Sequence, residues 1–143
     1  MKKLIRDQEG TAVVEFAIVL PLLVMIVFGI IEFGLLFYDK QVITNASREG
    51  ARLGIVATSP LPRKSDTDII VKVNEYTNNN LVSFSGVKIV TFPPSTITHP
   101  STQSGQPLTV TVKYAYQFLL LPKFISTLTG VQNLSATTVM NYE

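Results

Sequence analysis

The chain contains no cysteine among its 143 residues. Disulfide bonds, thiolate metal sites and cysteine nucleophiles are therefore excluded, although the redox compartment stays open because an oxidising compartment does not require disulfides. The single histidine, His99, lies in a polar stretch before Pro100 and has no partner at metal-ligand spacing. Asp66 and Asp68 are most simply interpreted as charges at a helix start. The sequence thus indicates no enzyme, no metal site and no other cofactor.

Charge is also scarce, with 12 Lys and Arg against 10 Asp and Glu and a formal net charge of +2. The basic residues form no cluster along one face, and the aromatic residues do not alternate with them as in a nucleic-acid surface. We therefore expect no nucleic-acid partner.

The dominant feature is an apolar stretch from Phe16 to Tyr38, interrupted by one charge, Glu32. As a helix its 23 residues would rise roughly 34 Å, close to the ~30 Å hydrocarbon core of a bilayer. Pro21 predicts a kink or a local loosening, although membrane helices also tolerate proline. Glu32 lies near the far end, where we expect its carboxylate to reach water. The stretch predicts a membrane-spanning helix.

Basic residues before the stretch predict its orientation. Lys2, Lys3 and Arg6 precede it, against Asp7 and Glu9, and acidic residues count for little in the positive-inside rule. The N-terminus should therefore remain in the cytoplasm and the C-terminal part should lie outside the cytoplasmic membrane. The apolar core is longer than that of an ordinary secretory signal.

The helix should begin at about Thr11, whose hydroxyl can cap it, and continue into water as far as about Ala57. Small residues at four-residue spacing, Ala46, Gly50 and Gly54, form part of one apolar face. Because glycine inside a helix costs up to about 1 kcal/mol relative to alanine, close packing against a neighbouring element is the expected compensation. A fraying end with Gly54 as C-cap is the alternative.

The remaining residues predict a small domain. Residues 58–64 contain two prolines and form a linker, and Ser65 or Asp66 caps a second helix that ends near Asn79. Strands are predicted at 87–92, 108–118 and 134–142, with a polar loop at 95–107 and a short helix or turn at 119–130. The expected buried positions of the helix and of the central strand are Ile69, Val73 and Tyr76, and Leu108, Val110, Val112, Tyr114, Tyr116 and Phe118.

The predicted fold class is α+β: a long N-terminal transmembrane helix extends into a domain with a second helix and a roughly three-stranded antiparallel sheet. The parts are a leader (1–10), the transmembrane helix with its amphipathic extension (11–57) and an extracytoplasmic domain (58–143). The apolar sheet face needs a cover, and the small-residue face and the second helix are the candidates.

Residues 10–16, G-T-A-V-V-E-F, resemble the prepilin peptidase site of the type IVb pilins called Flp. The following V-L-P-L-L-V, G-I-I-E-F-G-L-L-F-Y and T-N-A-S-R-E-G-A-R segments resemble the TadE-like pseudopilins of the tight-adherence (Tad) pilus machinery. Residues 108–143 resemble that family more loosely, whereas 58–107 carry no recognised signature.

The resemblance implies a minor pilin that is cleaved between Gly10 and Thr11 by a membrane prepilin peptidase and supports pilus assembly and surface attachment. Glu15 and Phe16 would guide subunit docking. If the chain is cut there, Thr11 gains a free ammonium one helical turn from Glu15, and a carboxylate with such a partner is much less costly to bury.

The implied partners are prepilin peptidase, other Tad pilins and pseudopilins, the inner-membrane assembly platform with its cytoplasmic ATPase, and the lipid bilayer. The implied location is the bacterial cytoplasmic membrane as a single-pass protein, or the pilus. The alternative is an uncleaved, anchored extracytoplasmic binding module whose loop at 93–107 contacts a ligand, in which case Gly10 is incidental.

Overall fold

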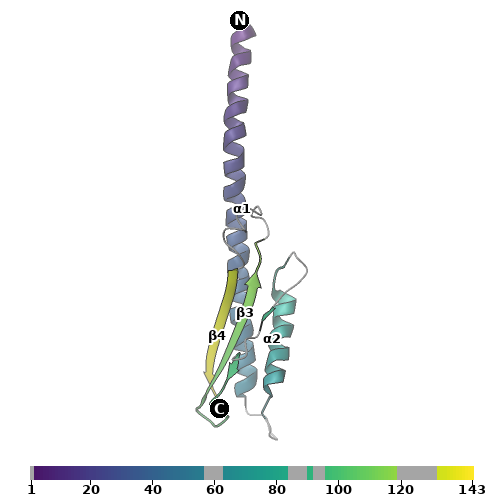
Figure 1. Ribbon diagram of the computed structural model, residues 1–143, viewed down its shortest axis with the longest axis vertical. Helices are drawn as coiled ribbons and strands as arrows, with labels where there is room; N and C mark the ends of the chain where they lie inside the picture. Colours follow the sequence, from purple (N-terminus) through teal and green to yellow (C-terminus); the bar gives the residue numbers. More distant parts are fainter. Residues whose placement is uncertain (1, 57–62, 84–89, 92–95, 119–131) are drawn as a thin grey trace.

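The structure, a computed structural model, describes residues 2–56, 63–83, 90–91, 96–118 and 132–143. A long helix, a second helix and a small antiparallel sheet confirm the α+β class. The elements are α1 (Lys2–Ile55), α2 (Asp66–Asn80), β1 (Val90–Thr91), β2 (Ile97–Thr98), β3 (Pro107–Tyr116) and β4 (Gln132–Asn141). The upper part of α1 projects alone, and its lower part runs along the sheet beside α2 (Figure 1).

α1 is a helix of 54 residues that begins at Lys2, so the predicted start at Thr11 is wrong. Residues 2–9 include Lys, Leu, Arg, Gln and Glu, which have high helix propensity, and Gly10 alone costs only about 1 kcal/mol. The helix ends at Ile55, close to the predicted end, and Ala57 lies outside the described residues. The segment that was predicted to be a leader and the apolar stretch therefore lie in one continuous helix.

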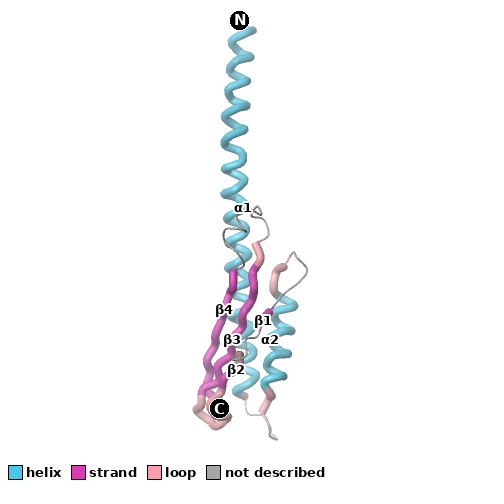
Figure 2. The backbone as a smooth tube through the Cα atoms, in the orientation of Figure 1, coloured by secondary structure: helices cyan, strands magenta, loops and turns pink. Residues whose placement is uncertain are grey.

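Pro21 does not interrupt α1. The helix is assigned without a break on both sides of the proline, and it runs without a sharp bend through this region in Figure 2. The predicted kink is therefore not observed. A proline costs one backbone hydrogen bond, and the helix here accommodates that loss.

α2 begins where the sequence predicted and ends one residue later than expected. Ser65 is its N-cap: the Ser65 hydroxyl accepts from the Asp68 backbone N–H at 3.2 Å, and Asp68 Oδ2 accepts from the Ser65 backbone N–H at 3.0 Å. This reciprocal pair is a capping box. The buried residues are Ile69, Val73 and Thr77. Tyr76 is only partly buried, because Thr77 occupies the inward position and its hydroxyl donates to the Val73 carbonyl at 2.9 Å.

The sheet is centred on β3, and every pairing is antiparallel. β4 pairs with the whole of β3, from Pro107↔Asn141 to Tyr116↔Gln132. β1 and β2 pair with separate parts of β3, and both occupy its other edge because β4 already fills the first. The sheet is thus four strands arranged three wide, which matches the predicted sheet of roughly three strands.

Strand boundaries differ in detail from the prediction. β3 and β4 lie within two residues of the predicted ranges, whereas β2 lies inside the segment that was predicted to be a loop. Only Val90 and Thr91 of the predicted strand 87–92 are in described structure. The predicted turn at 119–130 and most of the linker at 58–64 lie outside the described residues.

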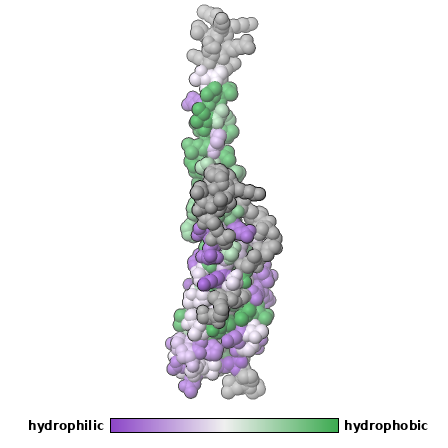
Figure 3. Space-filling view, in the orientation of Figure 1, coloured by the Kyte–Doolittle hydropathy of each residue, from purple (hydrophilic) through white to green (hydrophobic). Residues whose placement is uncertain are grey.

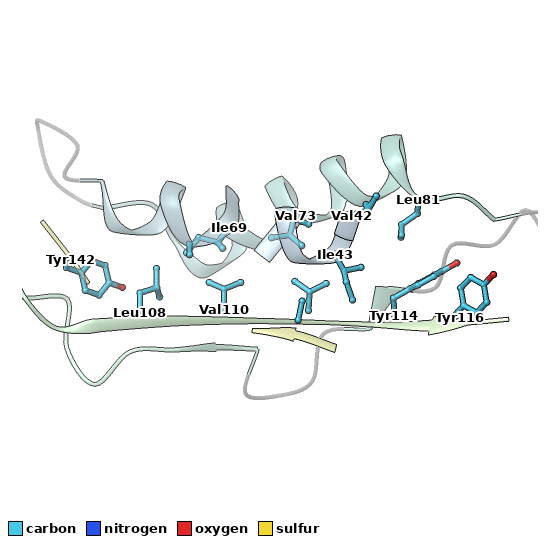
Figure 4. Close-up of a cluster of buried hydrophobic side chains, with 14 residues drawn as sticks. Val42, Ile43, Ile69, Val73, Leu81, Leu108, Val110, Tyr114, Tyr116 and Tyr142 are labelled. Atoms are coloured by element: carbon cyan, nitrogen blue, oxygen red, sulfur yellow. The ribbon is translucent and has the colours of Figure 1, made fainter. Parts of the chain in front are cut away.

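Both helices cover the same face of the sheet. In Figure 4, side chains of α1 (Val42 and Ile43) and α2 (Ile69 and Val73) point toward those of β3. The alternate residues of β3 are buried as predicted: Leu108, Val110, Val112, Tyr114 and Tyr116. Phe118, which was also expected to be buried, lies beyond the end of β3 and is only partly buried. Polar contacts join α1 to β4 as well, because Ser47 Oγ lies 2.7 Å from Thr138 Oγ1 and Lys40 Nζ donates to the Ser135 carbonyl. The core therefore fixes the direction of the projecting helix relative to the domain.

Candidate functional site: the free helix and its junction with the domain

The projecting part of α1, residues 10–31, is apolar and exposed; we call it the free helix. Its large side chains lie open to the surroundings, as at Phe16 (63% exposed) and Ile18 (72%). Figure 3 shows this segment as a hydrophobic column above the more polar domain. α1 is long and apolar enough to cross a membrane, with a mean hydropathy of 2.8 in its most apolar window, and no part of that window is buried. Such a surface is consistent with a single-pass membrane anchor.

The predicted processing and docking residues lie together at the start of the free helix. Gly10, Thr11, Glu15 and Phe16 are all exposed, and a Cβ at Gly10 would meet nothing within 4 Å. Thr11 and Glu15 are four residues apart, which places them on the same side of the helix. A second protein therefore has unobstructed access to this segment.

The small-residue face lies at the other end of α1, roughly 54 Å along the helix from Gly10 to Ala46. Ala46 is fully buried. A Cβ on Gly50 would stand 2.6 Å from Val73 Cγ2, and one on Gly54 would stand 2.5 Å from Leu108 Cδ2. The two glycines thus let α1 approach α2 and β3 more closely than any larger residue allows. These residues build the domain and lie far from the exposed residues 10–16 that we predicted for processing and docking.

Glu32 is the residue that sequence reasoning misplaced. We expected its carboxylate to reach water, but the residue is only 1% exposed. The Tyr116 hydroxyl donates to Glu32 Oε1 at 2.7 Å and lies 3.4 Å from the Glu32 backbone carbonyl oxygen. The expectation failed because the end of β3 rises alongside α1 and covers this carboxylate. Burial, and then the adjacent Glu32 carboxylate, raise the pKa of Tyr116 well above its usual range, which keeps the phenol protonated as a donor.

Asp39 forms a second buried acidic contact seven residues further along α1. It is 0% exposed, and its Oδ1 accepts a 3.0 Å hydrogen bond from the Val82 backbone N–H, just after α2. The neighbouring Tyr38 hydroxyl donates to the Asn80 carbonyl at 3.2 Å. Residues seven apart lie on nearly the same side of a helix, so the pair Glu32 and Asp39 was the available sequence signal for a covered face.

Comparison with protein families identifies this helix. Residues 10–52 match the model of the family described as TadE-like protein. This segment of the chain is similar to that family, and we call it the TadE-like segment. The TadE-like segment contains the free helix with Gly10 and Glu15, the buried acids Glu32 and Asp39, and most of the α1 surface that packs on the sheet. No curated protein and no solved structure matched the chain.

The domain that follows the TadE-like segment contains a pocket. This open pocket of about 740 Å³ is lined by residues at the start of α2, by His99 and by Tyr142 just after β4. His99, predicted as a solvated loop residue, lines it and places Nε2 3.3 Å from Asp66 Oδ1. Arg63 stacks over the Tyr142 ring at 4.8 Å. Within the described residues, no group of three or more His, Asp or Glu could hold a metal ion.

Proposed function

We propose that this TadE-like protein is a minor pilin, or pseudopilin, of the Tad (Flp) pilus that supports pilus assembly and surface attachment. The observation that carries the proposal is the free helix: it is exposed along its length, it belongs to the TadE-like segment, and the Gly10 to Glu15 motif lies at its start. An exposed apolar helix of this length requires either lipid or other apolar helices around it.

In this proposal, prepilin peptidase cuts after Gly10, and Thr11 becomes the new N-terminus. Gly10 suits such a site because it is small and its surroundings are open. The new ammonium lies one turn from Glu15, and the carboxylate can pair with that charge or with the ammonium of a neighbouring pilin. The pair lowers the cost of keeping an acid in apolar surroundings, and it directs subunits into register.

The proposal also implies the remaining partners. The basic head at Lys2, Lys3 and Arg6 keeps the N-terminus in the cytoplasm, where the inner-membrane assembly platform acts. The domain then lies in the periplasm or outside the cell. Other Tad pilins replace lipid around the free helix when the protein enters a fibre. Because the chain carries a whole domain, residues 58–143, after its helix, a role at the initiation or the tip of the pilus is favoured over a role as the repeating subunit.

A second candidate is a permanently anchored binding module. The observation that favours it is the open pocket of the domain, lined by polar residues of the 99–104 segment together with Arg63 and Tyr142. In that case the helix is an anchor only, and Gly10 and Glu15 have no role in processing or docking.

The location of the protein tests the proposal. In cells that assemble Tad pili, an antibody to the domain should detect the protein in sheared pili or at the membrane assembly site, and deletion of the chain should reduce piliation. Two results together would favour the anchored module instead. The protein would be spread evenly through the membrane of wild-type cells, and the deletion strain would show normal piliation and attachment.

A further inference from the structure

The outer side of α1 stays apolar beyond the point where the domain begins. Phe33 is 56% exposed and Phe37 is 67% exposed. These two residues follow Glu32, which the domain already covers. We call them the aromatic collar. Beyond Glu32, α1 therefore has a side that the domain covers and an apolar side that stays exposed.

Helix geometry separates the two sides. Each residue advances about 100° around an α-helix, so Glu32 and Asp39 face nearly the same way, toward the domain. Phe33 and Phe37 point roughly 100° and 140° away from Glu32. The collar thus continues the exposed surface of the free helix and does not belong to the domain core.

The lengths along α1 match the layers of a bilayer. From Gly10 to Glu32 the helix rises roughly 33 Å, close to the ~30 Å hydrocarbon core, and from Glu32 to Phe37 it rises roughly 8 Å more, about the thickness of one headgroup layer. If Gly10 lies at one edge of the hydrocarbon, Glu32 lies at the opposite edge. The collar then lies among the headgroups.

We propose that the domain is seated directly on the membrane, with the aromatic collar in the headgroup layer and the Tyr116–Glu32 hydrogen bond holding the domain to α1 at that depth. The proposal rests on α1 crossing a membrane, and it adds how the domain sits on the lipid surface. The collar contacts the headgroups of the bilayer that α1 crosses, because its surface is continuous with the helix surface that faces the hydrocarbon.

In this arrangement Glu32 sets the depth at which the domain rests on the membrane. A carboxylate near the hydrocarbon edge is costly unless it is hydrogen-bonded, and Tyr116 supplies a hydrogen bond from the domain. Rotation or lifting of the domain would break that bond and expose Glu32 to lipid. Glu32 is therefore a positioning residue that sets where the domain rests.

The absence of native cysteine allows a direct depth measurement. Single-cysteine forms of the full chain, Val19→Cys, Phe37→Cys, Gln117→Cys and Val71→Cys, each carry a bimane fluorophore in phosphatidylcholine vesicles. All four positions are exposed, and Val71, on the outer side of α2, is the control. The lipids are brominated either near the chain ends or close to the glycerol. Bromine quenches only fluorophores within contact range.

We expect chain-end bromine to quench Val19→Cys, and glycerol-level bromine to quench Phe37→Cys and Gln117→Cys. Val71→Cys should keep its full fluorescence in both lipids. Quenching at Val19 without quenching at Phe37 and Gln117 would overturn the seating and leave the membrane anchor intact. Absence of quenching at Val19 would overturn the anchor itself. A Phe37 probe that is shielded from water but unquenched would indicate a protein partner on the collar, which also contradicts the seating.

The role of Glu32 is tested in the Gln117→Cys background. Glu32→Ala should reduce the quenching of Gln117→Cys while the quenching of Phe37→Cys persists, because the helix keeps its depth and the domain moves. Glu32→Gln, whose amide oxygen can still accept a hydrogen bond from Tyr116, should keep most of the quenching of Gln117→Cys. If Glu32→Ala fails to fold, Tyr116→Phe provides the same comparison. Unchanged quenching at Gln117 in folded Glu32→Ala or Tyr116→Phe would show that the hydrogen bond does not hold the domain.

Discussion

Tyr116 and Glu32 lie 84 residues apart in sequence, yet the tyrosine hydroxyl donates a 2.7 Å hydrogen bond to the glutamate carboxylate. Tyr116 is at the end of β3 and only 3% exposed, and Glu32 is at the end of the free helix. The contact joins the part of the chain that bears the TadE-like segment to the part that does not. The hydrogen bond therefore ties the end of β3 to α1 at the level where the helix leaves the domain.

Removal of the tyrosine hydroxyl should destabilise this junction. Tyr116→Phe takes a hydrogen bond away from a carboxyl that is almost fully buried, and such a loss typically costs about 1–3 kcal/mol. The measurement is thermal or denaturant unfolding of the full chain in detergent micelles. Tyr76→Phe is the matched control, because no hydrogen bond to the Tyr76 hydroxyl is present among the described residues. Equal stability of the two variants would contradict the assigned importance of the junction.

Because α1 and α2 approach closely at Gly50, alanine should destabilise the protein there but not at Gly34. Gly50→Ala places a Cβ 2.6 Å from Val73 Cγ2, and a valine on a helix has little rotamer freedom with which to move away. Overpacking costs about 1–3 kcal/mol, part of which the better helix propensity of alanine offsets. We expect a net loss in the free energy of unfolding. Gly34→Ala, with nothing within 4 Å, should be neutral or slightly stabilising; a destabilising effect of the same size there would refute the packing argument.

The capping box of α2 predicts an acid-sensitive step. Hydrogen bonds from the Ser65 backbone and then its hydroxyl hold the pKa of Asp68 below its usual range. A group with a lowered folded-state pKa stabilises the fold above its unfolded pKa of about 3.9, and that contribution disappears as pH falls through the folded value. The melting temperature of the wild type should therefore drop below about pH 5. Asp68→Asn should melt lower at neutral pH and vary less with acid; an identical pH profile in the variant would exclude this source.

Much of the fold was predictable because its signals are local. The alternation of Leu108, Val110, Val112, Tyr114 and Tyr116 predicted a strand and its buried face, and Ser65 or Asp66 as a cap predicted a helix start. β2 was missed because a pairing of two residues, Ile97–Thr98, leaves no periodicity to detect. The burial of Glu32 was missed for a different reason. Its partner lies 84 residues away, and only tertiary packing brings the two together.

The candidate site shows the same division. Gly10, Thr11, Glu15 and Phe16 could be selected from the resemblance to the Flp prepilin peptidase site, and the structure adds that they lie exposed on α1. The small residues at 46, 50 and 54 predicted a packing face, but their partners Val73, Ile69 and Leu108 could come only from the fold. The processing and docking roles of these residues therefore stay predictions, whereas the structure shows how the domain is attached to the helix.

The carboxylate of Glu15 is expected to act after processing. Glu15→Ala and Glu15→Gln should both leave cleavage and membrane insertion intact but reduce the number of pili, because the proposed partner is an ammonium and a neutral amide cannot replace the charge. Electron microscopy of piliated cells and the mobility of the processed protein provide the two readouts. Normal piliation in Glu15→Gln would remove the ion pair from the account.

The mass of the mature protein tests the central claim most directly. In cells with an active prepilin peptidase, the membrane-extracted protein should begin at Thr11 and lack the ten leader residues, and Gly10→Leu should block that cleavage, since the scissile position is expected to require a small residue. Processing of Gly10→Leu at the wild-type rate would show that Gly10 is not the site. A wild-type protein that retains Met1 in such cells would contradict the assignment as a processed pilin and would leave the anchored binding module as the better account.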